Sequence, residues 1–341
     1  MKTSRLLRSR VLTLGSVIIA LLLPPGTAAA ANSAETKVVL AVDGVKVVRN
    51  LPVLVAEHLG YFKDEGLAVS FMETAVTPEV DGMLANGRVA GVMAFYHHTI
   101  VAQSEGRDCI SVIAMGASPG YVLLVANQLK DKVSQLSDLK GKRIITGGAH
   151  SAKSTSANML LLHQGFSTTD FTPLPTKDKA ANAETLKSGG ADFIIAPEPD
   201  ASFYQAQGVA TPFADLYSAA GTRRALGSAF PSTVLYMSAP YARAHPELAR
   251  QLVRAFSRAL KFINTHSAAE ITAAVPDVVG GEGKDPRVIA QGMKMFATDG
   301  LMDDAAARSE AKAISALFPE YAKVDLAKTY TNEFIAAVLK K

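Results

Sequence analysis

Several residue types and motifs that would mark particular protein classes are missing from this sequence. Its 341 residues include one cysteine, Cys109, which excludes an intramolecular disulfide framework and a cysteine-based zinc cluster. There is no H-E-x-x-H pattern, so the histidines are not expected to bind a metal ion in that way. After the first thirty residues, no segment reaches 18 uninterrupted apolar residues, so no membrane span is predicted there.

Basic charge is concentrated at the start of the chain. The formal net charge is +4, but residues 1–31 hold four basic residues and no acidic one. The rest of the chain has 31 basic and 31 acidic side chains. A neutral chain has no large basic field for a phosphate backbone, so we predict no nucleic-acid partner.

Residues 1–31 have the layout of a signal peptide. A basic stretch precedes the apolar run Val11–Leu23, and small residues that permit cleavage after Ala30 or Ala31 follow a Pro-Pro-Gly break. As a helix, that run spans only about 20 Å, against a hydrocarbon core of ~30 Å. There is no arginine pair before it and no cysteine at the cleavage point. The sequence therefore predicts a periplasmic protein secreted through the general export pathway.

Strand and helix patterns alternate, and they do so twice. Apolar strands are predicted at 37–42, 67–73, 89–95 and 110–115, with helical segments between them. A second series has strands at 121–126, 144–146 and 191–196 and a helix over 154–165. A later strand at 234–238 is followed by mostly helical sequence. The pattern predicts two α/β lobes, each with a mostly parallel sheet flanked by helices.

Ligands of open α/β sheets bind beyond the carboxyl ends of the strands. Five predicted loops occupy such positions: 43–50, 96–99, 116–120, 147–155 and 197–202. We expect them to face a common cleft.

The loop from Gly147 to Thr155 is the most informative of the five. Its two glycines allow a tight turn, and the following helix start would offer unpaired N–H groups to an anion. A nucleotide-binding P-loop would need glycine in place of Ala152, and an ordinary helix start capped by Ser151 or Ser154 remains an alternative. We predict an anionic or polar ligand, with these candidate residues: Ser151, Ala152, Lys153, Ser154 and Thr155.

The other loops add further candidates. A strand is predicted to end at Tyr96, His97 and His98, and we expect Tyr96 and one histidine to line the cleft. Neighbouring histidines in an extended chain point apart, so a metal site is disfavoured. Arg49 and Asn50 offer a guanidinium fork and an amide, or alternatively a solvated loop with Asn50 capping a helix. Glu198 is separated from Asp200 by a proline. We predict that it has a structural role or binds an amine of the ligand, rather than a catalytic role.

Four segments together resemble a known family, the periplasmic solute-binding proteins of ABC importers. The branch in question binds taurine, alkanesulfonates and thiamine precursors. The segments are Asn50–Val69, Met83–Val92, Ser137–Ile144 and Tyr241–Leu252. The sequence departs from the family pattern at the Tyr-His-His triplet, where small residues are common, and in having no tryptophan.

The resemblance implies an α/β, two-lobed type II periplasmic binding protein with a helical C-terminal tail. Lobe 1 would comprise 37–118 and 241–341, and lobe 2 would comprise 119–240. The family holds its solute at positions that correspond here to Arg49-Asn50, 96–98, Ser118 and 151–155. It implies hinge closure on a small solute without chemistry or cofactor, a membrane permease as partner, and a monomer.

The expected solute is a small organic acid, either a sulfonate or a carboxylate, because the start of the helix near Lys153 suits negative charge. An aminopyrimidine thiamine precursor held by aromatic stacking and Glu198 is the alternative. A secreted hydrolase or transferase using His97 or Glu198 is a rival from another functional class.

Overall fold

The computed structural model describes residues 35–340 apart from 75, 77, 150 and 277–285. The predicted signal peptide at 1–31 lies outside the described residues. Within them, none of the helices combines the length and apolar character needed to cross a membrane.

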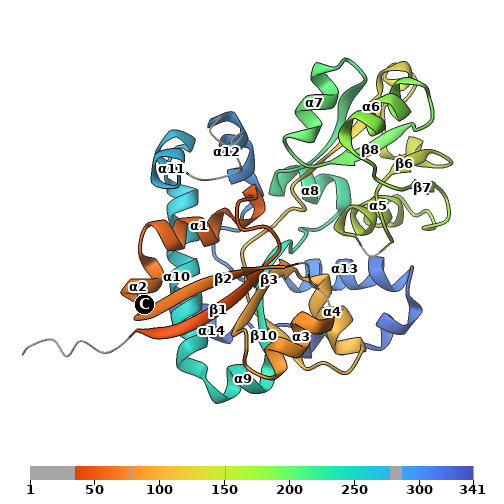
Figure 1. Ribbon diagram of the computed structural model, residues 1–341. Helices are drawn as coiled ribbons and strands as arrows, with labels where there is room; N and C mark the ends of the chain where they lie inside the picture. The colour runs from red at the N-terminus through yellow and green to blue at the C-terminus, as the bar shows by residue number, and fades with distance from the viewer. Residues whose placement is uncertain (1–34, 75, 77, 150, 277–285, 341) are drawn as a thin grey trace, which may run out of the picture. The chain divides into compact units, whose positions relative to one another are not determined.

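The first sheet has five strands in the order β2-β1-β3-β10-β4 (Figure 1). β1 is parallel to β2 and β3, whereas β10 is antiparallel to both of its neighbours. The register pairs Leu40 with Phe71 on one side and with Gly91 on the other. The strands are β1 Thr36–Val42, β2 Leu67–Glu73, β3 Gly91–Phe95, β4 Cys109–Ala114 and β10 Thr233–Ser238.

The second sheet repeats this plan in the order β7-β6-β8-β5-β9. Here β6 is parallel to β7 and β8, and β5 is the antiparallel strand between β8 and β9. Both sheets are therefore mostly parallel, as predicted. The strands are β5 Tyr121–Ala126, β6 Arg143–Ile145, β7 Thr172–Leu174, β8 Phe193–Ala196 and β9 Ala210–Leu216.

Each sheet is covered by helices on both faces, which explains the nearly continuous apolar strands. Successive strand residues alternate between two clusters: Leu235 packs with Phe256 and Leu252 of the long helix α10, whereas Val234 belongs to the cluster on the opposite face. Helices beside the first sheet include α1 Leu51–His58, α2 Tyr61–Asp64, α3 Pro78–Ala85, α4 His97–Ser104, α9 Ala239–Ala244, α10 Pro246–Thr265, α11 Ala268–Ala274 and α14 Glu333–Leu339.

The second sheet is sandwiched in the same way. One face packs on α5 and α8, with Leu160 and Leu226 in the same cluster as Leu123. The other face packs on α6 and α7, with Leu186 and Tyr204. The helices are α5 Ala152–His163, α6 Lys179–Lys187, α7 Asp200–Ala206 and α8 Ala219–Leu226.

Two segments connect the sheets, 115–120 from β4 to β5 and 217–232 from β9 to β10. The predicted boundary between the lobes, at 240, would assign β10 to the second lobe. The structure instead pairs β10 with β3 and β4, so this strand completes the first sheet. An apolar strand such as β10 would suit either sheet, so its local sequence does not say which sheet it joins. Only its pairing with strands distant in the chain decides this.

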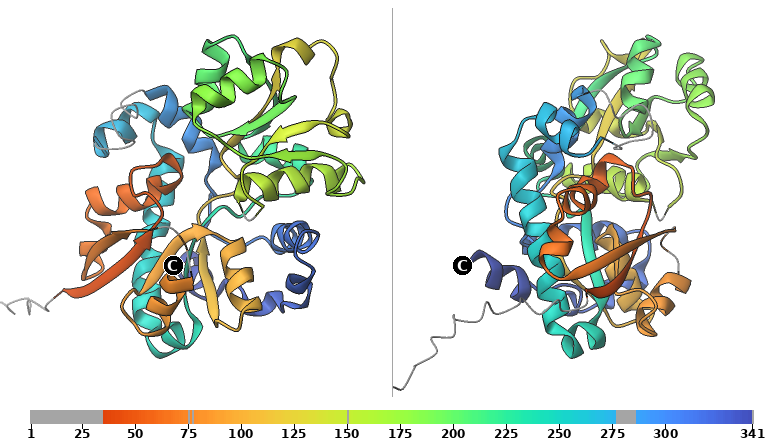
Figure 2. Two further views of the ribbon diagram at one scale, coloured as in Figure 1. Left: turned by 45° about the vertical axis from the view of Figure 1, so that its right-hand side comes forward. Right: turned by 60° about the vertical axis from the view of Figure 1, so that its left-hand side comes forward.

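The C-terminal region runs beside the first crossing segment and then returns to both sheets. The Ala117 amide donates to the Met295 carbonyl at 2.8 Å, next to an isolated bridge between Gly116 and Phe296. This region also contains α12 Pro286–Gly292, α13 Asp304–Ser315 and the short 3-10 helix η5 Pro319–Lys323. Figures 1 and 2 show α13, in blue, beside α4 and α5, both of which it contacts.

Candidate functional site

The loop after β1 is organised by its own side chains. Arg49 Nη2 donates to the carbonyl and the carboxylate of Asp43, at 2.7 and 2.8 Å. The Asn50 amide is buried and donates to the carbonyls of Asp43 and Gly44, at 3.1 and 2.8 Å. Asn50 therefore shapes the loop, and its side chain makes no helix-capping bond. The half-exposed guanidinium of Arg49 lies 5.9 Å from the centre of the Phe95 ring.

Tyr121, the first residue of β5, brings the second sheet's chain to this loop. Burial raises the pKa of the Tyr121 phenol to about 12, while the positive charge of Arg49 acts in the opposite direction. The Thr233 hydroxyl donates to the Arg49 carbonyl at 2.9 Å. Arg49, Phe95 and Tyr121 thus form an aromatic and basic corner near the crossing segments.

The Tyr96, His97 and His98 triplet does not form a loop, because α4 begins at His97. Tyr96 is fully buried, and its hydroxyl shares a 2.5 Å hydrogen bond with Thr329 Oγ1. His97 is also buried, with Nδ1 3.3 Å from a carboxylate oxygen of Glu310. Only His98 is half-exposed. The expected stacking of Tyr96 on a solute does not fit this placement, since the helix start turns its ring into the core.

Ser118 joins the two crossing segments. Residues 116–120 read Gly-Ala-Ser-Pro-Gly and match the G-x-S-x-G pattern of hydrolase nucleophiles. Ser118, however, lies between two strands rather than at a strand-to-helix turn, and it is fully buried. Its hydroxyl donates to the Tyr217 carbonyl at 2.6 Å. These observations favour a structural role for Ser118.

The start of α5 follows β6, as the glycine-rich sequence predicted. Ser151 is the N-cap: its Oγ accepts from the Ser154 amide at 3.1 Å and donates to the Thr146 carbonyl at 3.0 Å. The Thr155 hydroxyl donates to the Ser151 carbonyl at 3.3 Å, and Ala152, Ser154 and Thr155 are buried. The hydroxyls of Ser151 and Thr155 therefore bond within the turn.

Lys153 is the half-exposed residue of this turn that carries a charge. Its Nζ donates to the Thr176 hydroxyl at 3.2 Å. Burial lowers the pKa of Lys153, and the negative charge of Asp200 acts against that shift. An ammonium with one neutral hydroxyl partner has donors left for a ligand.

Two carboxylates follow β8, the neighbour of β6 in the second sheet: Glu198, and Asp200, whose charge acts on Lys153. Glu198 Oε2 accepts from the Ser202 amide at 3.0 Å. Burial raises the pKa of the Tyr217 phenol, and the charge of Glu198 adds to the shift. This group of three side chains, Lys153, Asp200 and Glu198, follows the neighbouring strands β6 and β8 and holds two negative charges and one positive charge.

Three of the predicted residues, Arg49, Lys153 and Glu198, keep a half-exposed charged side chain, and they lie in two places. Arg49 belongs to the corner at the first sheet, while Lys153 and Glu198 belong to the group at the second. Sequence reasoning missed Phe95, Tyr121, Thr176 and Tyr217, although each lies at or within two residues of a strand end. Their role in solute contact, like that of all the candidates, stays a prediction.

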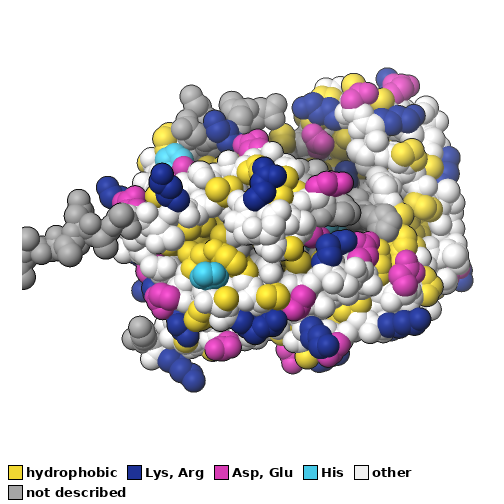
Figure 3. Space-filling model, turned by 60° about the horizontal axis from the view of Figure 1, so that its bottom comes forward, with side chains coloured by type: hydrophobic (Ala, Val, Ile, Leu, Met, Phe, Trp, Pro, Cys, Tyr) yellow, Lys and Arg dark blue, Asp and Glu magenta, His cyan; other side chains and the backbone are white. Residues whose placement is uncertain are grey.

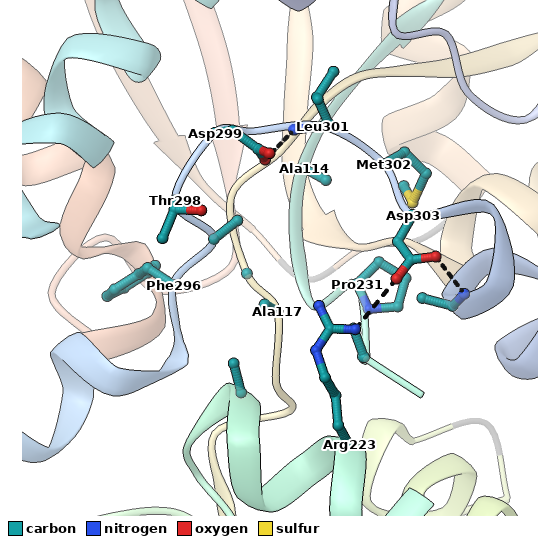
Figure 4. Close-up of a pocket in the computed structure, with 15 residues that line it drawn as sticks. Ala114, Ala117, Arg223, Pro231, Phe296, Thr298, Asp299, Leu301, Met302 and Asp303 are labelled. Atoms are coloured by element: carbon teal, nitrogen blue, oxygen red, sulfur yellow. Dashed lines mark hydrogen bonds and ion pairs between the residues drawn. The ribbon is translucent and has the colours of Figure 1, made fainter. Parts of the chain in front are cut away.

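A separate cavity of about 340 Å³ lies behind the first crossing segment (Figure 4). Arg223 of α8 and Asp303, the N-cap of α13, meet at its edge at 3.3 Å. The residues around the cavity include none of the twelve predicted site residues. The ion pair is exposed on both sides, so it adds little stability.

Two features bear on the kind of ligand: the residues that could bind a metal ion, and the basic side chains on one face of the molecule. Among the described residues, no group of three or more His, Cys, Asp or Glu side chains could hold a metal ion. On the face shown in Figure 3, Lys and Arg side chains are interspersed with Asp and Glu. That face therefore offers no continuous basic surface to a nucleic acid.

Residues 49–269 match the model of the family described as NMT1/THI5 like. The chain belongs to this family. The "Putative binding protein YtlA" of Bacillus subtilis (strain 168) is 24% identical over 72% of this chain and 71% of its own length. The 4-amino-5-hydroxymethyl-2-methylpyrimidine phosphate synthase of Schizosaccharomyces pombe is 29% identical over 28% of this chain, and the match spans only 27% of the synthase.

Solved structures show the same fold. A protein of Bordetella bronchiseptica RB50 is 28% identical, with a TM-score of 0.70 over 90% of this chain and 98% of that one. The periplasmic aliphatic sulphonate binding protein SsuA of Escherichia coli is 17% identical, with a TM-score of 0.66 over 86% and 91% of the two chains. The predicted fold class and the family resemblance are thereby confirmed.

Proposed function

We propose that this protein captures a small solute between its two sheets and delivers it, chemically unchanged, to a membrane permease of an ABC importer. The observation that carries the proposal is the pair of matching five-stranded sheets joined by two crossing segments. In this arrangement the carboxyl ends of β1 and β3 and those of β6 and β8 carry the two groups of candidate side chains. Membership in the family and the fold of SsuA support the same function.

Hinge closure would be the binding mechanism. A solute bound by Lys153 at the second sheet would gain contacts with Arg49 of the first half when the halves close, and these extra contacts favour the closed state. Ser118 and Tyr217, hydrogen-bonded across the crossing segments, would keep the hinge in register. The permease would recognise the closed form.

A small sulfonate or carboxylate is the first candidate solute. Lys153 lies in the first turn of α5, where the helix dipole adds to its positive charge. The sulphonate named for the Escherichia coli neighbour fits the same chemistry.

An aminopyrimidine is the second candidate, and the carboxylate of Glu198 is the observation that favours it. The carboxylate of Asp43 forms an ion pair with the guanidinium of Arg49, and the negative charge of Asp200 raises the pKa of Lys153 against the effect of burial. The negative charge of Glu198 is then in excess of the positive charges. A carboxylate suits an exocyclic amino group, and Tyr121 could stack on the ring. The name of the Schizosaccharomyces pombe synthase contains an aminopyrimidine phosphate, a compound of the same class.

Thermal-shift measurements with ethanesulfonate, taurine and 4-amino-5-hydroxymethyl-2-methylpyrimidine test the proposal on the purified protein, with mass spectrometry of the recovered solute. Stabilisation by one of them with its mass unchanged supports transport, because a binding protein performs no chemistry. Conversion of the compound would instead support the secreted-enzyme alternative using His97 or Glu198.

Two variants then separate the solute classes. Lys153→Ala is expected to weaken a sulfonate by about 1–3 kcal/mol, the range for a hydrogen bond to a charged group. Glu198→Gln is expected to weaken the aminopyrimidine and to leave the sulfonate unchanged or tighter. Lys177→Ala, which removes an exposed lysine of the same lobe, is the matched control. Equal affinity of the Lys153 and Lys177 variants would remove Lys153 from the site.

A further inference from the structure

The C-terminal helix α13 belongs to both halves of the molecule. Its residue Ala313 lies in the apolar cluster of the second sheet with Leu160 of α5. The next residue, Ile314, lies in a cluster of the first sheet with Ile100 of α4. α13 thus packs between α4 and α5, the two helices that begin at the candidate site (Figures 1 and 2).

The face of α13 that carries Ala313 also carries a carboxylate, Glu310, whose exposure is 0%. Its Oε1 lies 3.3 Å from His97 Nδ1, and both side chains are buried. Burial raises the pKa of Glu310 well above its ordinary range, and the nearby backbone of His97 acts against this shift. A carboxylate in an apolar layer is unfavourable unless it is bonded, so leucine here would pack at lower cost.

His97 connects this carboxylate to the candidate site. The His97 ring is stacked on Phe95, with centroids 5.9 Å apart, and lies 4.3 Å from the ring of half-exposed His98. Phe95 in turn lies beneath the Arg49 guanidinium. Contacts therefore run from Glu310 through the rings of His97 and Phe95 to the guanidinium of Arg49.

We propose that Glu310 is a positioning residue of the solute site: from α13 it fixes His97 and the first turn of α4, and through them the ring of Phe95. This inference rests on the proposed solute-binding function. It adds that solute affinity depends on α13 being seated between α4 and α5, although α13 carries none of the predicted contact residues.

Other titratable groups lie on the elements around α13, and their surroundings differ from those of Glu310. Tyr96, just before α4, lies close enough for the charge of Glu310 to raise the pKa of its phenol, after the larger effect of burial. His163 of α5 lies with Ser309 and Lys312 around a different cavity. Tyr321 of η5 lies in the apolar cluster of Ile314. His97 is therefore the group that pairs with Glu310.

The test compares Glu310→Gln and Glu310→Leu with Arg308→Gln, an exposed change on the same helix. The first readout needs no solute: hydrogen exchange of the amides of residues 97–104 in the full protein. Both Glu310 variants are expected to exchange at least tenfold faster there, with little change in α10, whereas Arg308→Gln matches the wild type. Wild-type protection of α4 in both Glu310 variants would overturn the proposal.

The second readout is the affinity for whichever of ethanesulfonate, taurine and the aminopyrimidine stabilises the wild type, measured from pH 5 to 9. The glutamine variant is expected to bind at least fivefold more weakly and to lack the wild-type pH step, because glutamine does not titrate. Affinity within twofold of wild type with the same pH profile refutes a positioning role. If the wild type binds none of the three, the proposed function fails, and the exchange experiment still decides the role of Glu310.

Discussion

Gly116, in the segment that crosses from β4 to β5, lies against the start of β10, and its replacement by alanine tests this contact. An alanine Cβ would lie 1.8 Å from Ser232 Oγ and 2.7 Å from the Thr233 backbone nitrogen. The hydroxyl can rotate away. The backbone nitrogen cannot, because the amides of Met115 and Gly116 donate to the Thr233 carbonyl at 2.7 and 3.0 Å.

The expected cost combines two effects. Forcing one methyl group into a well-packed core costs about 1–3 kcal/mol. Separating the two backbones weakens at least one hydrogen bond, for about 1 kcal/mol more. We therefore expect Gly116→Ala to lower the free energy of unfolding by about 2–4 kcal/mol, as measured by urea denaturation followed by circular dichroism.

Gly82→Ala is the matched control. Gly82 is exposed within α3, and a methyl group added there would have no neighbouring atom within 4 Å, so alanine should stabilise the protein by about 0.5–1 kcal/mol through its better helix propensity. The double variant Gly116→Ala/Ser232→Ala should regain only the part of the loss due to the hydroxyl. Wild-type stability of Gly116→Ala would refute the claim that the crossing segment and β10 are rigidly joined.

Three further outcomes are expected in the same denaturation assay. Phe256→Ala, which removes a fully buried ring 5.3 Å from that of Phe62, should cost about 3–5 kcal/mol. Burial acts to raise the pKa of Asp192, but hydrogen bonds from Arg143 lower it overall. Asp192→Asn should therefore lower the free energy of unfolding by about 1 kcal/mol at neutral pH, a value that already allows for screening by the solvent around Arg143. The difference from the wild type should vanish as the pH falls through the folded-state pKa of Asp192. Because burial raises the pKa of Glu310, the wild type should lose stability as the pH rises through that pKa. The free energy of unfolding of Glu310→Gln should therefore rise relative to that of the wild type with increasing pH. A difference that stays constant with pH would contradict this assignment.

Local patterns predicted most of the strands. β2 and β5 have the predicted bounds, and α5 begins two residues before the predicted helix. The pattern failed where pairing over long distances decides. β9 was not predicted, because Pro212 and Asp215 interrupt its apolar residues, and β10 was assigned to the wrong sheet.

The site was predictable only at the level of loops. The rule that ligands bind at the carboxyl ends of strands selected the regions of Arg49, Lys153 and Glu198. It could not show that Tyr96 and His97 turn inward, because their partners Thr329 and Glu310 lie more than 200 residues later in the chain. Hydrogen-bond partners so distant leave no trace in local spacing.

The position of β10 has a consequence for how the chain acquires its structure. β4 lies at the sheet edge with β10 as its neighbour, so the first sheet stays incomplete until residue 238 has been made. By then all five strands of the second sheet have been synthesised, and they are contiguous in the chain. The second sheet therefore has all of its strands before the first sheet does. A chain that ends before Thr233 would leave β4 without its neighbour β10, so it would not contain a complete first sheet.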